Sequence, residues 1–518
     1  MPVSCGQSMS IDATTIPAPG ALRRGRSGRG RGVLAHRLAL SERQLAGGAL
    51  LLIVALSALI VLAAAGEPTF LSAPARSNYF PAWMSGPLGG IWTGIASEAT
   101  LKWLFSGAIL LSYGAYVLLI RHAGALRMRT LLVAVVALQL IYLLAPPLAL
   151  TDVFNYLNYA RMEIVHHLNP YVTMPVLEPH GDPAYALSNW HGLLSPYGPL
   201  FTIFTFVFAR LSPGAYLWSY KGALLIADAG LIALVVAGAQ LLGRDRRQAL
   251  ALVALNPIVL VWGLGADHND FFTIVLVALA LYCLLRSGKE RQAGALRRLA
   301  VGRWALGSAD LLDGGAGFAL AIATGMKASA VVLIPIALAA LARERVRVLA
   351  LLSGVAVGGA IGLAATFAAF GAHFPDLAIQ STLVTALSIP NLLGLALAQG
   401  GETATLHSLI TLALVLATAA CCLHAYRRRD LLVAGGFSTI AVIATLSWVL
   451  PWYIVWVLPF TALAGSERLR RATLWLGLYL ILTWVPVASQ VMSSVGFHPQ
   501  QTAVGREHGR AVEELLTP

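Results

Sequence analysis

Charged residues are scarce in this chain of 518 residues. Only 11% of them are Asp, Glu, Lys or Arg, whereas 58% are hydrophobic. A soluble domain carries about 25% charged residues, so this composition excludes an ordinary soluble fold and indicates an integral membrane protein. The net charge of +13 does not indicate a nucleic-acid partner, because the basic residues lie in short clusters between apolar runs, as in cytoplasmic loops.

Cysteines and the common catalytic motifs are scarce as well. Cys5 lies in the N-terminal tail, and the other three cysteines, Cys283, Cys421 and Cys422, lie within apolar runs. This distribution does not fit a disulfide framework or a metal-binding pattern. The chain also lacks a glycine-rich phosphate loop, a zinc motif and a nucleophile elbow.

Long apolar runs fill most of residues 44–490. A helix of about 20 apolar residues crosses the hydrocarbon layer, and no strand-length alternation repeats. We therefore predict an all-α polytopic membrane protein with about eleven to fourteen membrane segments. Residues 1–43, rich in Arg and Gly, are predicted to be a disordered basic cytoplasmic tail, and residues 491–518 an extracytoplasmic C-terminal tail.

Some of the apolar runs are unusual. Residues 200–211 are short for a span and are predicted to form an interfacial or re-entrant helix. Residues 318–341 are interrupted near Lys327 and have basic flanks on both sides, which favours two short helices. Lys221 and Asp228 are seven residues apart within one span and share a face, so we expect a structural ion pair.

Residues 151–199 are the polar stretch around which the chain is organised. They follow an apolar run, yet they carry many ionisable and aromatic side chains. An ionisable group costs about 3 kcal/mol near the centre of a membrane helix, so this stretch must lie at or outside the membrane surface. The alternation of basic clusters places it outside, with a second outer loop at residues 371–405. It is too long for a plain connector, and we predict that it is the active-site loop of a membrane enzyme.

Asp152, near the start of this loop, is the predicted general base. A carboxylate beside a low-dielectric wall has a raised pKa and can accept a proton from a sugar hydroxyl. Capping of the following helix is the alternative role, and it is compatible with the first. A helix would place Tyr156 and Tyr159 on the face of Asp152. Arg161 would point elsewhere, either to bind phosphate or to reach the membrane interface.

Other candidate residues lie later in the chain. The outer turn GADHND holds His268 and Asp270, and helix capping there would not require an imidazole. Lys327 is a cation within an apolar segment, where ionisable residues usually serve function, although it could also reach toward the interface. Trp452 and Tyr453 lie near an outer turn and form either an interfacial belt or a sugar-stacking surface.

Several segments occur in an order that resembles a known family. They are TDVFNY, HHLNPY, LSPYGPLF, ALNPIVLVWGLGADHND, GMKASAVVLIPIAL and PWYIVWVLPF. They look like the polyprenol-phosphate-mannose-dependent α-1,6-mannosyltransferases of actinobacteria, which belong to the GT-C class of membrane glycosyltransferases. The resemblance covers residues 131–464. It implies the GT-C fold, a lipid-phosphate sugar donor, an extracytoplasmic acceptor and inversion at the anomeric carbon.

The resemblance also implies that Asp152 is the catalytic residue. The donor phosphate is expected at Arg161, His268 or Lys327. The sugar or acceptor is expected to contact Tyr156, Tyr159, Trp190, Tyr197, Asp270, Trp452 and Tyr453. Many such enzymes carry an acidic pair where this chain has Asp152 followed by Val153. We therefore expect no cofactor and predict no metal site, while a divalent metal is not excluded.

These observations predict an inverting hexosyltransferase of the inner (plasma) membrane, with mannose as the expected sugar. Its expected partners are a polyprenyl-phosphate sugar, a glycan or glycolipid acceptor of the cell envelope, and the lipid bilayer, with no nucleic acid. A transporter or flippase is an alternative, but such proteins usually show internal repeats and polar sites at the midplane. An O-antigen-type polymerase is another alternative, disfavoured here because the outer loops contain few arginines.

Overall fold

The computed structural model describes residues 27–516 except residues 67, 74–80, 95–96, 295–297, 302–303, 377 and 380–381. Residues 1–26 of the predicted N-terminal tail lie outside the described residues. Residues 27–43, where we expected disorder, are helical and continue into the first span. Alanine, leucine and arginine dominate the later part of this stretch, and they are strong helix formers.

The regular elements of the described residues are helices, as predicted, apart from one antiparallel ribbon of two short strands, β1 (Arg298–Val301) and β2 (Trp304–Gly307). The α-helices are α1 (Ser27–Gly66), α2 (Ala82–Ser85), α3 (Glu98–His122), α4 (Met128–Leu143), α5 (Asp152–Ile164), α6 (Pro199–Thr205), α7 (Pro213–Leu241), α8 (Arg246–Ala254), α9 (Asp270–Gln292), α10 (Ser308–Met326), α11 (Leu333–Leu341), α12 (Arg345–Phe370), α14 (Ile389–Ala396), α15 (Ala404–Arg428), α16 (Leu431–Thr445), α17 (Leu458–Ala464), α18 (Glu467–Trp484), α19 (Ala488–Ser494) and α20 (Ala503–Leu516).

Among the described residues, six helices are long and apolar enough to cross a membrane: α1 from Ser41 onward, α3, α7, α9, α12 and α15. Helices α18 and α19 add a seventh span if they are counted together, although they are bent by 76°. Shorter apolar helices lie between the long ones at Met128–Leu143, Pro199–Phe208, Ala328–Leu341, Leu431–Thr445 and Pro451–Ala464. This arrangement is that of a multi-pass membrane protein. The predicted number of segments was higher because it included these shorter helices.

Small residues allow α10 and α12 to pack closely. A Cβ atom added to Gly317 would lie 2.0 Å from the carbonyl oxygen of Leu351, and one added to Gly354 would lie 1.8 Å from that of Gly314. Close backbone approach of this kind is how membrane helices gain packing energy, because lipid supplies little hydrophobic drive between them. Larger side chains at Gly317 or Gly354 would force the two helices apart.

Several helices are interrupted within the bundle. Helix α10 ends at Lys327, whose backbone is extended, and a 3-10 turn (Ala328–Val332) leads on to α11. Helix α8 stops ahead of Pro257, because proline lacks an amide hydrogen and disfavours helical geometry in the residue before it. A 3-10 segment (Pro451–Trp456) likewise separates α16 from α17. Irregular backbone at membrane depth is tolerated where it is buried in protein or lines a cavity.

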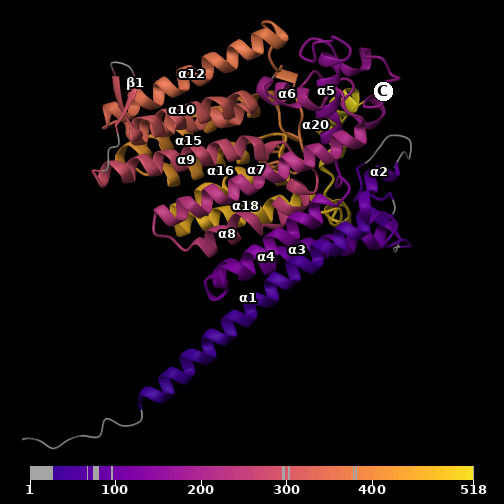
Figure 1. Ribbon diagram of the computed structural model, residues 1–518. Helices are drawn as coiled ribbons and strands as arrows, with labels where there is room; N and C mark the ends of the chain where they lie inside the picture. Colours follow the sequence, from indigo (N-terminus) through magenta and orange to yellow (C-terminus); the bar gives the residue numbers. More distant parts are fainter. Residues whose placement is uncertain are drawn as a thin grey trace, which may run out of the picture.

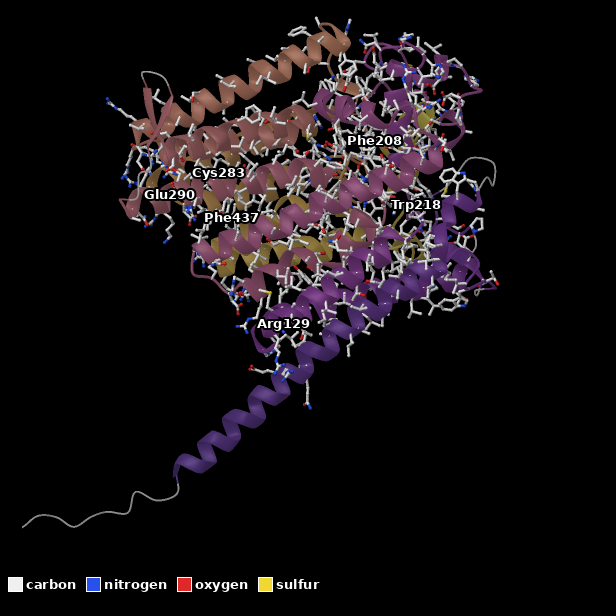
Figure 2. The ribbon with its side chains drawn as sticks, in the orientation of Figure 1. Arg129, Phe208, Trp218, Cys283, Glu290 and Phe437 are labelled. Atoms are coloured by element: carbon white, nitrogen blue, oxygen red, sulfur yellow. The ribbon has the colours of Figure 1, made fainter. Side chains whose placement is uncertain are left out.

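The two ends of the bundle differ in charge. Figure 1 shows the β1 ribbon at one end and α5, α20 and the C-terminus at the other. Helix α9 begins at Asp270 and carries Lys289 and Arg291 in its last turn. At the basic end, Arg347 Nη2 lies 3.0 Å from Asp313 Oδ1. Figure 2 shows Glu290 near this end, whereas Phe208 and Trp218 lie toward the other.

Candidate active site

A cavity of about 390 Å³ lies between the loop of residues 151–199 and the interrupted helices. We call it the catalytic cavity. Nine of the eleven predicted site residues line it: Asp152, Tyr156, Trp190, Tyr197, His268, Asp270, Lys327, Trp452 and Tyr453. They come from the first turns of α5, the loop before α6, the turn before α9, the break after α10 and the 3-10 segment before α17. Residues far apart in the sequence are thus brought into one cavity.

Asp152 is the first helical residue of α5, and Thr151 occupies the capping position without a capping side-chain hydrogen bond. The Asp152 carboxylate accepts a hydrogen bond from the Tyr197 hydroxyl at 2.9 Å. Among the described residues, the carboxylate makes no other hydrogen bond. Asp152 therefore does not cap the helix with its side chain. Burial raises the pKa of Asp152 to about 6, even though the Tyr197 hydroxyl and the charge of Lys327 act to lower it.

Lys327 and Asp270 form an ion pair in the wall of the catalytic cavity, with Nζ 2.6 Å from Oδ1. The same carboxylate oxygen accepts a hydrogen bond from the indole N–H of Trp456. The Lys327 ammonium also lies 4.8 Å from the ring centre of Tyr453, within the range of a cation–π contact. Lys327 lines the cavity and keeps 24% of its side chain exposed.

His268 stacks on Trp452, with the ring centres 3.5 Å apart and the planes 12° from parallel. Its Nδ1 lies 3.4 Å from the Tyr156 hydroxyl. Its Nε2 is buried without a hydrogen-bond partner among the described residues. Burial, helped by the charge of Lys327, holds the pKa of His268 well below its ordinary value. The imidazole is therefore neutral, so the predicted contact of His268 with the donor phosphate would be a hydrogen bond and not an ion pair.

A buried ion pair holds the turn that carries His268. Lys221 Nζ in α7 lies 3.0 Å from Oδ1 of Asp267, whose backbone is left-handed with φ of 60°. The predicted pair of Lys221 with Asp228 is therefore wrong. Asp228 instead accepts a hydrogen bond from Gln139 of α4. Sequence spacing showed that the two side chains share a helix face, but it could not reveal a nearer partner on another segment.

Arg161 and Tyr159 do not line the catalytic cavity. The Arg161 guanidinium donates Nε and Nη2 hydrogen bonds to Asp182, each 2.8 Å long, and an Nη1 hydrogen bond to the carbonyl of Ala209. These contacts connect parts of the outer loop and engage the guanidinium outside the catalytic cavity, so the role of Arg161 as a phosphate ligand stays a prediction. The hydroxyl of Tyr159 donates to the Leu193 carbonyl at 2.7 Å, so this ring supports the wall from behind.

Sequence reasoning missed a polar cluster on another wall of the catalytic cavity. Buried Glu402 accepts a hydrogen bond from Ser447 at 2.7 Å, and His407 Nδ1 lies 2.9 Å from the same carboxylate oxygen. Ser447 and His407 line the cavity. A signal was present in the sequence, because Glu402 ends an outer loop and a histidine follows five residues later. Within the described ranges, no three His, Cys, Asp or Glu side chains form a group suited to a metal ion.

Residues 44–343 match the family model described as alpha-(1->6)-mannopyranosyltransferase, N-terminal domain. The match covers more than half of the chain. The chain belongs to this family. Membership identifies it as a glycosyltransferase of the mannosyltransferase type, as the resemblance predicted. No curated protein and no solved structure matched the chain. In this mannosyltransferase, Asp152, His268 and Lys327 lie within the matched region, whereas Trp452 and the Glu402 cluster lie beyond it.

Proposed function

We propose that this protein transfers a mannosyl residue, with inversion, from a polyprenyl-phosphate donor to a glycan or glycolipid acceptor on the extracytoplasmic side of the membrane. One observation carries the proposal. A single cavity holds Asp152, a carboxylate whose pKa is raised to about 6, together with the partly exposed cation Lys327. A base and a cation are the two groups that a transfer from a phosphate leaving group requires.

In the proposed reaction, an acceptor hydroxyl oxygen attacks the anomeric carbon of the donor mannose. Asp152 takes the hydroxyl proton as the new carbon–oxygen bond forms. The bond from the anomeric carbon to the phosphate oxygen breaks, and its electron pair leaves with the polyprenyl phosphate. A carboxylate with a pKa of about 6 is mostly ionised at neutral pH, yet it is more basic than an ordinary aspartate.

Lys327 neutralises the phosphate in this proposal. The Asp270 carboxylate and the ring of Tyr453 hold the ammonium in place, so little reorganisation is needed when charge develops on the leaving oxygen. The ammonium has three N–H groups, and one of them suffices for Asp270. Neutral His268, with Nε2 unpartnered, adds a hydrogen-bonding group to the same cavity.

The polarity of the bundle supports the proposed extracytoplasmic location. Helix α9 has 23 residues, which is about 34 Å of helix, close to the thickness of the hydrocarbon core. Asp270 begins this helix, and Lys289 and Arg291 lie in its last turn. Basic residues accumulate on the cytoplasmic side of membrane proteins. The end that carries Asp270 and the catalytic cavity is therefore proposed to face outward.

Transfer by the purified full-length protein in liposomes tests the proposal. Radiolabelled polyprenyl-phosphate mannose is supplied with an alkyl α-mannoside or an α-1,6-linked mannotetraoside as acceptor. We expect the label to appear in a product that is one mannose longer than the acceptor. An α-1,6-specific mannosidase should release the label from this product. GDP-mannose serves as the control donor and should give no product. Movement of the labelled lipid across the bilayer without transfer would contradict the proposal and favour a flippase.

A further inference from the structure

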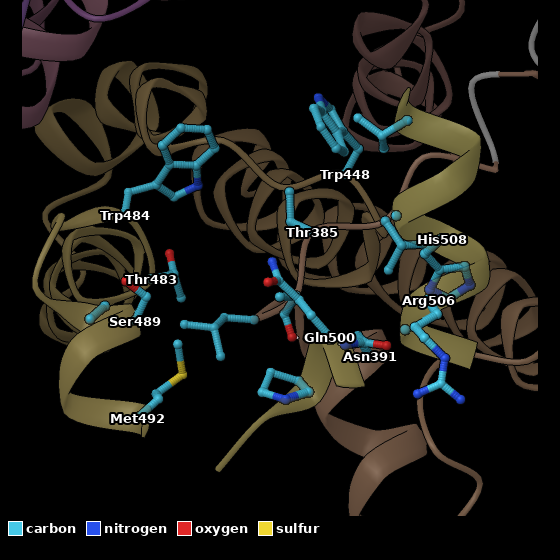
Figure 3. A pocket seen from close by; sticks show the side chains of 18 of the residues that line it. Thr385, Asn391, Trp448, Thr483, Trp484, Ser489, Met492, Gln500, Arg506 and His508 are labelled. Carbon is cyan, nitrogen blue, oxygen red and sulfur yellow. Dashed lines mark hydrogen bonds between the residues drawn. The ribbon is translucent and has the colours of Figure 1, made fainter. Parts of the chain in front are cut away.

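A second cavity, of about 800 Å³, lies beside the catalytic cavity. We call it the C-terminal cavity, because α18, α19, α20 and the segment of residues 384–391 build most of it. Figure 3 shows Trp448, Trp484, Thr385 and Gln500 around it. Its volume is within the range of about 300–1,000 Å³ that is usual for ligand pockets. The proposed transfer reaction, as described above, makes no use of this space.

The two cavities share a wall. Trp448 lines both of them, and its ring lies edge-on to Trp190 of the catalytic cavity, with 6.1 Å between the ring centres. Ser447 lines the catalytic cavity, and its carbonyl accepts a hydrogen bond from the amide of Thr385, which lines the C-terminal cavity. The two cavities therefore adjoin at Trp448, and a chain-like ligand that extends past this ring would reach the C-terminal cavity.

The C-terminal cavity is lined by chemistry that suits a polyhydroxylated, uncharged chain. Trp448 and Trp484 supply two flat apolar rings, and the indole N–H of Trp484 is tied to the Val449 carbonyl. Gln500, Arg510 and Glu513 supply amide, guanidinium and carboxylate groups that can donate or accept hydrogen bonds. Rings for stacking, interspersed with side chains that can donate and accept hydrogen bonds, fit a sugar chain better than a polyprenyl tail.

Helix α20 is fixed in place as a wall of this cavity. At its C-terminal end, the carbonyl of Leu515 accepts a hydrogen bond from the amide of Gly192 in the active-site loop, at 3.0 Å. Just before its first residue, the hydroxyl of Thr502 donates to the Gly400 carbonyl of the second outer loop. A side chain at Gly192 would collide with the backbone of Glu514. The C-terminal segment is thus attached to both outer loops rather than being a free tail.

We propose that the C-terminal cavity is an acceptor subsite, which holds a neutral hexose oligosaccharide behind the hydroxyl that reacts at Asp152. This inference rests on the proposed transfer function and assigns the acceptor a path past Trp448. An acceptor of a single sugar fills only the catalytic cavity, whereas a longer glycan gains contacts with Trp484, Gln500 and Arg510. The protein should therefore prefer acceptors of several sugars.

Filling the C-terminal cavity tests this proposal. Val512→Trp places an indole in the cavity, and Glu507→Trp adds the same side chain to α20 at an exposed position that does not line it. With the α-1,6-linked mannotetraoside, we expect Val512→Trp to raise the acceptor KM at least tenfold. The KM for the alkyl monomannoside and the KM for polyprenyl-phosphate mannose should stay within twofold of the wild type. Glu507→Trp should resemble the wild type with both acceptors.

Equal effects of Val512→Trp on the long and the short acceptor would overturn the proposal, and a raised donor KM would show that the cavity takes the lipid instead.

Binding of the mannotetraoside without donor, measured by saturation-transfer NMR, provides a test that does not depend on turnover. Wild-type binding that weakens in Val512→Trp supports the subsite, and absence of wild-type binding overturns it. If Val512→Trp fails to fold, Gln500→Ala with Arg510→Ala replaces it in both experiments. A wild-type protein that binds the glycan but transfers no sugar would contradict the proposed function alone.

Discussion

Lys327 Nζ lies 2.6 Å from Asp270 Oδ1, although the two residues are 57 positions apart in the sequence. Asp270 opens α9, and Lys327 stands at the break that follows α10. From the sequence, we expected Lys327 to meet phosphate and Asp270 to meet sugar. Their pairing means that a substitution of either residue changes the stability of the protein and the chemistry of the cavity together.

Lys327→Met therefore needs a partner variant. The single substitution leaves Asp270, which is 1% exposed, as an unpaired buried charge, and removing one partner of a buried pair costs about 3–5 kcal/mol. Lys327→Met with Asp270→Asn should recover most of the unfolding temperature. If Lys327 binds the donor phosphate, the donor KM of this double variant should still be raised at least tenfold. A donor KM near that of the wild type would show that the ion pair is purely structural.

His268→Phe keeps a flat ring on Trp452 but removes both ring nitrogens. We expect the unfolding temperature to change little and kcat/KM to fall by about 10-fold to 100-fold, because one hydrogen bond in a dry site is lost. Since the pKa of His268 lies well below its ordinary value, the imidazole does not titrate near neutral pH. The acidic limb of the pH–rate profile should keep its position in this variant. A displaced limb would show that His268 itself carries the titrating proton.

Arg161→Met tests whether Arg161 stabilises the outer loop or binds the donor phosphate. Burial raises the pKa of Asp182, but hydrogen bonds from Arg161 and from the amide of Ala184 outweigh it and leave this pKa below its ordinary value. The stabilisation is present above the unfolded-state pKa of about 3.9 and is lost as the pH falls through the lower folded-state pKa. Arg161→Met should lower the unfolding temperature at pH 7, by less at pH 3, and leave the donor KM unchanged.

Arg161→Lys is the matched control for that variant. It keeps the charge but cannot form the two-pronged contact with Asp182, so its unfolding temperature should fall between those of the wild type and Arg161→Met. A donor KM that rises in both variants, without loss of stability, would show that Arg161 binds the donor phosphate.

Thiol labelling in intact cells tests the proposed orientation. In a variant without the four native cysteines, Gly181→Cys places a thiol in the active-site loop, where an added Cβ meets nothing within 4 Å. Lys289→Cys places one in the last turn of α9, also at an exposed position. A membrane-impermeant reagent should label position 181 in intact cells and position 289 only after lysis. The opposite labelling pattern would show that the bundle has the reverse orientation in the membrane.

The sequence predicted the helical class and most of the catalytic cavity, because ionisable and aromatic side chains between apolar runs are costly unless they serve a site. Asp152, His268 and Lys327 stand out for this reason. Partners could not be predicted, since the pairing of Lys221 with Asp267 and of Arg161 with Asp182 depends on how distant segments pack. Ser447 of the polar cluster gave no signal, because a serine beside an apolar run has many ordinary roles.

The packing of the C-terminal segment could not be predicted from the sequence either. Residues 491–518 were predicted to be a tail, and amphipathic α20 within them could equally have lain on a membrane surface. The structure instead packs its end against Gly192 of the active-site loop. That contact is made between backbone groups, which no side-chain pattern encodes.

Asp152→Asn, assayed across pH together with thermal unfolding, tests the central claim most directly. The substitution preserves size and removes a charge that burial destabilises, so the unfolding temperature at pH 7.5 should equal or exceed that of the wild type. In the wild type, kcat/KM should fall as the pH drops below about 6, because the base becomes protonated. In Asp152→Asn, kcat should fall about 100-fold or more, and this limb should vanish. A folded Asp152→Asn protein with near-wild-type turnover and an unchanged acidic limb would contradict Asp152 as the base.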